Sequence, residues 1–543
     1  MLRKMIFRKR YIRKKFAKQF YMSPDAYSNV DFVRERLDEI GIFQKQGWDI
    51  RDCKNESMVS GMDDVTWNDL EMDEIFLRLN HTRSFVGEQI MYQKLRDLEP
   101  TYPNIEKNIT YIANHPEKRM DIERRLCDIG KHRNDYYLPM ILRNPTQWKM
   151  KGNLIFKLLQ FTLIACGTMA LILRSQICAR ITLLIAIINL AISMVLKMKY
   201  EALLFCVGSI RSMIQLCQYI EKDSELCKNF LTEELKDTLG VAKRITKYIG
   251  NFQIRRNNAM SGDLAGLLLD YILGFLLYDV ITYGKIITFL EKHNLEIIKL
   301  YEFIGTMDMN IAIASFRARV GEWCVPSCSN KTINVKNMRY PGFENCVPND
   351  ILIKRGVMLT GANASGKSTF MKALAINVIL SKTINTACAT SFSIPFNLGI
   401  MSSMALRDDI LTGESYYIKE INQLKQMLEI INQDTPMLLI IDEILKGTNS
   451  IERVAASYGV LEYLKDKNVY VVVATHDISL VEMVKDEYQC YYFSSDIMDD
   501  KIFFDYKLHK GINDRSNAIQ LLEYSGFPED IIENAKAQIK SII

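Results

Sequence analysis

The first half of the chain carries apolar side chains at the spacing typical of helices. In residues 65–145, and again in residues 200–316, hydrophobic positions recur every three or four residues among polar ones. This period places the apolar side chains on one face of a helix. A turn-rich stretch, residues 321–342, follows. The pattern predicts an all-α first half that ends near residue 325.

Two segments of this half are almost continuously apolar. Residues 153–173 and 181–198 are each about long enough for a helix to cross the roughly 30 Å apolar core of a bilayer. The nearby basic residues are Lys149, Lys151, Lys197 and Lys199 at the outer ends, and Arg174 and Arg180 in the link, residues 174–180. This distribution favours a transmembrane hairpin with both chain termini in the cytosol. The alternative is a pair of helices buried inside a large all-α domain.

A third apolar segment, residues 264–275, contains and adjoins acidic residues, among them Asp263, Asp270 and Asp279. Recurring charge is more typical of a buried amphipathic helix than of a third span, and we expect the former.

A glycine loop in the last third of the chain predicts a phosphate-binding site. Gly-Ala-Asn-Ala-Ser-Gly-Lys-Ser-Thr, residues 361–369, follows an apolar run and precedes a helical pattern. Gly361 and Gly366 let the backbone curl so that N–H groups face phosphate oxygens, while Lys367 reaches the β- and γ-phosphates and Ser368 binds Mg²⁺. We count Asn363 and Thr369 of the same loop among the nucleotide-binding residues. The alternative is a glycine-containing turn with an ordinary surface lysine.

Two further apolar runs of the kind found in buried parallel strands end in polar residues. Residues 437–441 precede Asp442 and Glu443, and residues 469–474 precede Thr475-His476-Asp477. We expect Asp442 to hold Mg²⁺ through water and Glu443 to polarise the attacking water. His476 is expected to contact the γ-phosphate as a catalytic residue; the alternative is a strand-end histidine with structural hydrogen bonds only.

Another segment, residues 408–415, leads into a helical pattern and holds Gly413 and Ser415 at the expected helix start. A helix N-terminus is a second anion-binding position. Because the chain already supplies one phosphate loop, we expect these two residues to serve the nucleotide of a partner subunit, which predicts a homodimer with composite sites.

The charge of the chain is concentrated at its start. The 543 residues carry a net charge of +5, but the first 18 hold nine Lys or Arg and no acid, which leaves −4 for the remainder. The body therefore has no global basic footprint for nucleic acid. The first 22 residues interleave basic and apolar positions, as segments on anionic lipid or a phosphate backbone do; a solvated tail is the alternative.

The twelve cysteines form no framework. Cys324 and Cys328 are a close pair without a second pair, so a zinc site is not expected. Scattered cysteines are typical of a reducing, cytosolic setting.

The last 200 or so residues resemble the ATPase domain of the MutS family, the mismatch-repair branch of the ABC-type ATPases. The matching features are the phosphate loop with Asn363, residues 408–415 with Glu420, Ile441-Asp442-Glu443-Ile444 before Gly447-Thr448, Ala474-Thr475-His476, Cys346-Val347-Pro348-Asn349-Asp350, and a tail with Lys510-Gly511-Ile512, Arg515-Ser516, Gly526-Phe527-Pro528 and Ile531. Residues 65–320 are more weakly similar to the MutS helical core and lever.

This resemblance, taken with the apolar and basic patterns described above, implies a multidomain fold. Its expected parts are a basic segment (1–60), the first part of an all-α helical core (61–150), a two-span transmembrane hairpin (151–200), the second part of the core with its lever (201–325), and an α/β P-loop ATPase domain of ABC type with a C-terminal dimerisation segment (326–543). It also implies ATP and Mg²⁺ as cofactors. Tyr340 and Phe343 are the candidates for contact with the adenine.

The sequence departs from the family pattern in places. Lys446 stands where MutS proteins usually carry arginine, and Ala362 and Ser365 replace the usual proline and glycine. Only about 60 residues precede the helical core, and the Phe-x-Glu triplets at Phe289 and Phe527 lie in a helical run and in the tail, so we expect no mismatch-reading domain.

Two functions fit these features. The first is an ATP-hydrolysing, dimeric clamp on double-stranded DNA, anchored to a bacterial cell membrane with its ATPase domain in the cytoplasm. The second is a membrane-tethered mechanical ATPase that acts on a protein partner without mismatch recognition. A wholly cytoplasmic protein is the alternative if the hairpin is buried. An ABC transporter subunit is disfavoured, because two spans per chain are few and the Leu-Ser-Gly-Gly-Gln signature is missing.

Overall fold

The structure is a computed structural model of the chain. It describes residues 61–98, 104–150, 152–249, 271–329, 331–342, 346–362, 365–404, 416–431, 435–498, 501–512 and 526–542. Within these residues the chain forms two compact units. The first contains Asn80–Tyr92 and Lys107–Ser315, and the second contains 61–79, Gln93–Glu106 and Phe316–Ile543. The domain boundaries expected from the sequence stay a prediction, since this grouping does not test them.

The first unit is helical throughout the part that the structure describes. It contains all or part of α5 (Phe85–Asp97), α6 (Asn104–Asn114), α7 (Pro116–Ile129), α8 (Leu138–Arg143), α9 (Asn153–Leu173), α10 (Gln176–Lys222), α11 (Ser224–Phe230), α12 (Glu233–Ala242) and α15 (Tyr278–Val320). Side chains cap several starts: Asp223 accepts hydrogen bonds from two amides of α11, and Thr232 accepts one from Leu235 of α12. The helical first half predicted from periodicity is confirmed.

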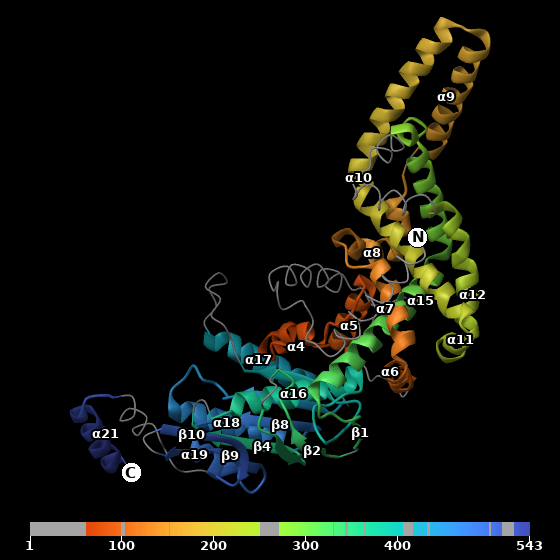
Figure 1. The fold of residues 1–543 in the computed structure, drawn as a ribbon. Helices are drawn as coiled ribbons and strands as arrows, with labels where there is room; N and C mark the ends of the chain where they lie inside the picture. Colours follow the sequence, from red (N-terminus) through yellow and green to blue (C-terminus); the bar gives the residue numbers. More distant parts are fainter. Residues whose placement is uncertain are drawn as a thin grey trace. The chain divides into compact units, whose positions relative to one another are not determined.

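The two most apolar segments form an antiparallel helix pair. Helix α9 and the first half of α10 extend beyond the other helices of their unit (Figure 1). Their link is shorter than the predicted 174–180: Arg174 adopts a left-handed φ of 47°, and the Ser175 hydroxyl accepts a hydrogen bond from the Cys178 amide, so α10 already begins at Gln176. Helix α10 is 47 residues long in all and ends at Lys222, well past the predicted end at residue 198.

The apolar side chains of this pair are exposed. Within the described residues, two helices are long and apolar enough to cross a membrane, and only 6% and 11% of their most apolar windows are buried. Leu154, Phe161 and Leu183 are 72%, 69% and 64% exposed. The alternative of two helices buried in a helical domain does not fit these exposures.

The third apolar segment is described only from Tyr271 onward. Tyr271 and Ile272 are 48% and 52% exposed whereas Gly274 is buried, so the expected buried amphipathic helix stays a prediction. The described part packs against α10, where the buried Asn189 amide donates to the Phe275 carbonyl at 2.9 Å. The remainder, residues 264–270, lies outside the described residues.

The second unit contains two β-sheets with helices. The larger has the strand order β10-β9-β4-β8-β7-β6, and the smaller β1-β5-β2-β3. The strands are β1 (Ser327–Cys328), β2 (Ile333–Met338), β3 (Asn349–Ile353), β4 (Gly356–Gly361), β5 (Ser391–Ile394), β6 (Gly399–Ser403), β7 (Met437–Asp442), β8 (Val469–Ala474), β9 (Gln489–Met498) and β10 (Lys501–Lys510). Strands β4, β7 and β8 are apolar and buried nearly throughout, as parallel strands are.

Helices cover the larger sheet. They are α16 (Lys367–Ile384), α17 (Tyr416–Ile430), α18 (Ser450–Leu464) and α19 (Ile478–Val484), and α21 (Glu529–Ile542) follows near the chain end. One hydrophobic core joins Leu439 and Val471 of the strands to Met427, Leu461 and Val481 of the helices. The predicted helical region followed by an α/β region is confirmed.

A short N-terminal helix closes one edge of the larger sheet. Helix α3 (Asp64–Asp69) lies beside β6, the edge strand. The Ser402 amide donates to Thr66 Oγ1 at 2.9 Å, and Asp69 Oδ2 accepts from both Ser402 Oγ and the Met404 amide at 2.8 Å. These bonds provide acceptors for donor groups at the open edge of the sheet, and the acceptors come from side chains more than 300 residues away in sequence.

We expect Asp69→Ala to destabilise the second unit by about 2–3 kcal/mol, because it leaves two buried donors without their acceptor. Urea unfolding followed by tryptophan fluorescence, with the buried Trp67 on the same helix as a probe, measures this. The control is Asp64→Ala, which removes an ion pair whose carboxylate is 61% exposed and should change stability by less than about 1 kcal/mol. Equal effects of the two substitutions would contradict the assignment.

Candidate functional site

Three parallel strands deliver the predicted chemical residues to one edge of the larger sheet. Ala474, the last residue of β8, is paired in register with Leu359 of β4 on one side and with Asp442 of β7 on the other. The chain leaves all three strands in the same direction. The loops that begin at Gly361, Asp442 and Thr475 therefore lie side by side, where ligands of open α/β sheets bind.

The glycine loop has the backbone that its sequence predicts. Gly361 and Gly366 have φ angles of 139° and 107°, a region that favours glycine. A Cβ at Gly361 would lie only 2.8 Å from the Phe493 carbonyl oxygen, so a side chain there would displace the backbone. Gly366 is the N-cap of α16, whose first residue is Lys367. The loop thus ends at a helix N-terminus, a favourable place for phosphate.

Lys367, the first residue of α16, is almost fully buried. Its Nζ donates to the carbonyl oxygens of Gly361 at 2.7 Å and Ala362 at 2.9 Å. Burial lowers the pKa of this ammonium, and Asp442 and Glu443 oppose the shift. Asn363 lies outside the described residues. Thr369 is exposed in the first turn of α16.

The two predicted magnesium-binding residues are neighbours. Ser368 Oγ donates to Asp442 Oδ2 at 3.3 Å, and Lys446 Nζ lies 3.6 Å from the same oxygen. A hydroxyl and a carboxylate at a phosphate loop are hard oxygen donors that suit Mg²⁺. In the described residues no three His, Cys, Asp or Glu side chains form a metal-binding group. A Mg²⁺ ion shared with phosphates and water needs no such group, so the residues present fit the ion.

Glu443 is held in an unusual backbone conformation. Its φ is +63°, rare for a residue other than glycine, and its amide donates to the Ala474 carbonyl at 2.9 Å. This bond ties the residue after β7 to the last residue of β8, two positions before His476. Strained backbone of this kind is common where a side chain must point into a site.

His476 lies within electrostatic range of the other site residues. Partial burial lowers the pKa of its imidazole, the Lys367 ammonium lowers it further, and the carboxylates of Glu443, Asp442 and Asp477 oppose these effects. The lowered pKa favours the neutral imidazole, which can donate one hydrogen bond and accept another. Lys367, Asp442, Glu443 and His476 thus gather at one edge of the sheet.

The second predicted anion-binding segment is described only from the helix that follows it. Gly413 and Ser415 lie outside the described residues, and α17 begins directly after them at Tyr416. On α17, the buried Glu420 accepts a hydrogen bond from the Lys446 amide at 2.9 Å. Glu420 therefore connects the helix after the predicted partner-facing segment to the loop after Glu443.

The two adenine candidates, Tyr340 and Phe343, stay a prediction. Tyr340 is only 7% exposed and its ring packs on Gly342, which leaves little of it for a ligand, and Phe343 lies outside the described residues. Another aromatic residue that the sequence analysis did not single out lies beside the loop: Tyr506 of β10 is 46% exposed, has a φ of +54°, and its ring edge would lie 3.3 Å from a Cβ at Gly366. Its position results from an irregularity between Phe504 and Leu508 that the alternation of β10 does not reveal.

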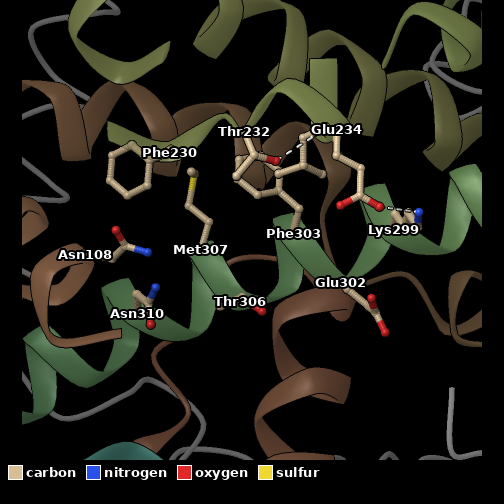
Figure 2. A pocket seen from close by; sticks show the side chains of 11 residues that line it. Asn108, Phe230, Thr232, Glu234, Lys299, Glu302, Phe303, Thr306, Met307 and Asn310 are labelled. Carbon is tan, nitrogen blue, oxygen red and sulfur yellow. Dashed lines mark hydrogen bonds and ion pairs between the residues drawn. The ribbon is translucent and has the colours of Figure 1, made fainter. Parts of the chain in front are cut away.

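The helical unit contains a cavity of about 470 Å³ that none of the predicted site residues lines. Phe230, Phe303 and Met307 contribute apolar surface, and Lys299 forms a 2.5 Å ion pair with Glu234 (Figure 2). Glu302 adds a further negative charge, so the lining carries more acid than base. This charge disfavours a triphosphate here.

Comparison with known proteins finds similarity in the second unit. Residues 357–543 match the family model MutS domain V. The DNA mismatch repair protein MutS of Pseudothermotoga lettingae is 30% identical over 251 residues, which are 44% of this chain and 31% of that protein. MutS of Petrotoga mobilis is 28% identical over 266 residues, 47% and 32% of the two chains.

MutS of Clostridioides difficile is also 28% identical over 259 residues, 45% of this chain and 27% of that protein. The chain thus spans about a third of the length of these curated relatives. The glycine loop, Asp442, Glu443 and His476 all lie inside the matched residues. The described geometry and these matches together support a relationship of this chain to the MutS family through MutS domain V.

Proposed function

We propose that the chain is a Mg²⁺-dependent ATPase. The observation that carries the proposal is the meeting of Ser368, Lys367 and Asp442 at the edge where Glu443 and His476 also lie. A phosphate loop, a carboxylate at the end of another strand of the same sheet, and an acid beside it are the parts that phosphoryl transfer to water requires. The similarity of residues 357–543 to MutS domain V supports the same activity.

Each residue has a distinct role in this proposal. Lys367 would exchange its two carbonyl partners for β- and γ-phosphate oxygens of ATP, and Ser368 and Asp442 would hold Mg²⁺, which would supply positive charge against those phosphates. Glu443 accepts a proton from the attacking water, and His476 donates a hydrogen bond to a γ-phosphate oxygen. The Tyr506 ring is placed beside the loop, where its face can pack on the adenine.

We expect Glu443→Gln to bind ATP but to hydrolyse it at least about 100-fold more slowly, because the amide cannot accept the proton. Binding of a fluorescent ATP analogue and release of phosphate measure the two steps. Glu482→Gln, on the exposed surface of α19, is the control and should leave both unchanged. Unchanged hydrolysis in Glu443→Gln would remove Glu443 as the base.

The proposal includes a homodimer in which Gly413 and Ser415 of each chain complete the site of the other. A composite site makes the ATPase rate per subunit rise with protein concentration until dimers are saturated. Substituting Ser415 by Ala should lower that rate without weakening nucleotide binding to the monomer. A rate independent of concentration in a protein that stays monomeric with ATP would exclude this arrangement.

Double-stranded DNA is the first candidate partner of this ATPase, since the named relatives are DNA mismatch repair proteins. Binding to a duplex through basic patches should weaken steeply as salt rises from about 50 to 200 mM. No binding at about 50 mM salt with ATP, with or without a mismatch, would instead favour the second function, a mechanical ATPase that acts on a protein partner.

We further propose that α9 and the first half of α10 anchor the protein in a membrane. Exposed apolar side chains along two helices of bilayer length support this. The full chain should then remain in membrane pellets after carbonate washing, and a chain lacking residues 153–198 should become soluble while still hydrolysing ATP.

A gentler variant tests the same anchor without a deletion. Ile164 and Ile187 are 51% and 56% exposed, so their replacement by Lys changes little if water surrounds the helices. In a bilayer each charge costs about 2.5–3.5 kcal/mol near the centre, and the double variant should be released by carbonate. If the native chain is found in the soluble fraction, and the double variant fractionates in the same way, the two helices do not anchor the protein in a membrane.

A further inference from the structure

A paired arginine and aspartate connect helix α18 to the loop that carries His476. Arg453, in the first turns of α18, donates from Nε to Asp477 Oδ2 and from Nη2 to Asp477 Oδ1, both at 2.9 Å. The side chains are 22% and 17% exposed. A two-bonded guanidinium–carboxylate contact fixes orientation as well as distance.

The position of each partner makes this pair more than a link between helices. Asp477 directly follows His476, and it is the N-cap of α19 although its side chain makes no capping bond. Helix α18 follows the loop that begins at Glu443 and contacts that loop again where Ser457 Oγ donates to the Ile444 carbonyl at 3.3 Å. Asp477 therefore orients its carboxylate toward α18 instead of toward its own helix.

The pair also balances charge. Asp477 lies one residue from the imidazole that would face the γ-phosphate, so an unpaired carboxylate here would repel a triphosphate. Arg453 cancels that charge. Its guanidinium also lies within electrostatic range of Glu443. An ordinary ion pair at the surface would affect only the free energy of unfolding, typically by less than about 1 kcal/mol, and would change neither kcat nor KM.

We infer that Arg453 and Asp477 are positioning residues that clamp the His476 loop to the helix following Glu443, and that Arg453 shields the phosphate site from the Asp477 charge. This inference rests on the proposed ATPase function. It requires two separable effects: the geometry of the clamp aligns Glu443 and His476 during hydrolysis, whereas the charge of Arg453 permits ATP binding.

The test measures kcat and KM for MgATP in four variants of the full chain. We expect Arg453→Gln to lower kcat and to raise KM, each about 10-fold, because geometry and charge balance are both lost. Asp477→Asn should lower kcat without raising KM. The double variant Arg453→Gln/Asp477→Asn should return KM to the native value while kcat stays low, because the unpaired carboxylate is gone.

Arg453→Lys separates charge from geometry. Lysine keeps the positive charge but cannot form the two-bonded contact, so KM should remain native while kcat falls. Lys485→Gln is the control, since it breaks the exposed Lys485–Glu482 pair on α19 and should leave both constants unchanged. Thermal unfolding of each variant identifies any that lose their fold, and Arg453→Lys retains a test in that case.

The outcomes separate the clamp from the proposed ATPase. Native kcat and KM in both Arg453→Gln and Arg453→Lys would overturn the clamp alone. A double variant with a KM as high as that of Arg453→Gln would overturn the shielding role. Absence of MgATP hydrolysis by the unchanged chain would overturn the proposed function, and the clamp with it.

Discussion

The parallel register of β4, β8 and β7 is the constraint on which the candidate site depends. Because Leu359, Ala474 and Asp442 are neighbours across three strands, the next residue or two of each strand must emerge at the same edge. The three strands are apolar on both faces, so burial holds them in the interior of the unit, and their backbone pairing sets this register. The chemistry of the site is therefore a consequence of sheet packing rather than of the loops alone.

Local sequence signals were sufficient for the parts of the site that depend on local geometry. Glycines at 361 and 366 determine the curl of the loop, and an apolar run that ends in Asp442 determines where a carboxylate leaves the sheet. The helix α9 was likewise predicted at its observed bounds, since a continuous apolar run needs no distant partner to be recognised. The short link after it could not be predicted, because it depends on the capping by Ser175 and on the left-handed backbone of Arg174.

Contacts between segments far apart in the sequence could not be predicted from the sequence. Asp69 reads as a polar residue of a surface helix, yet it is buried against the edge strand β6 through Ser402 and Met404. Tyr506 reads as one position of an alternating strand, yet an irregular backbone turns it toward Gly366. Arg453 reads as a solvated helix residue until Asp477 is placed opposite it. Each case needs the pairing of the sheet first, because only that pairing brings the two partners together.

The charged side chains described at this edge are of two kinds. Lys367 and Asp442 have contacts that a bound nucleotide or cation could replace, whereas Arg453 and Asp477 are paired with each other. Lys367 is held by carbonyl oxygens that phosphate oxygens can replace, and Asp442 is shared by Ser368 and Lys446, whose contacts with it a divalent cation can replace. Nucleotide binding in the proposed site would thus replace internal contacts, which reduces the desolvation that binding must overcome. Arg453 and Asp477 satisfy one another with two short bonds and have no such replacement available. A fixed pair beside exchangeable ones is what keeps Glu443 and His476 in a constant relation while their neighbours change partners.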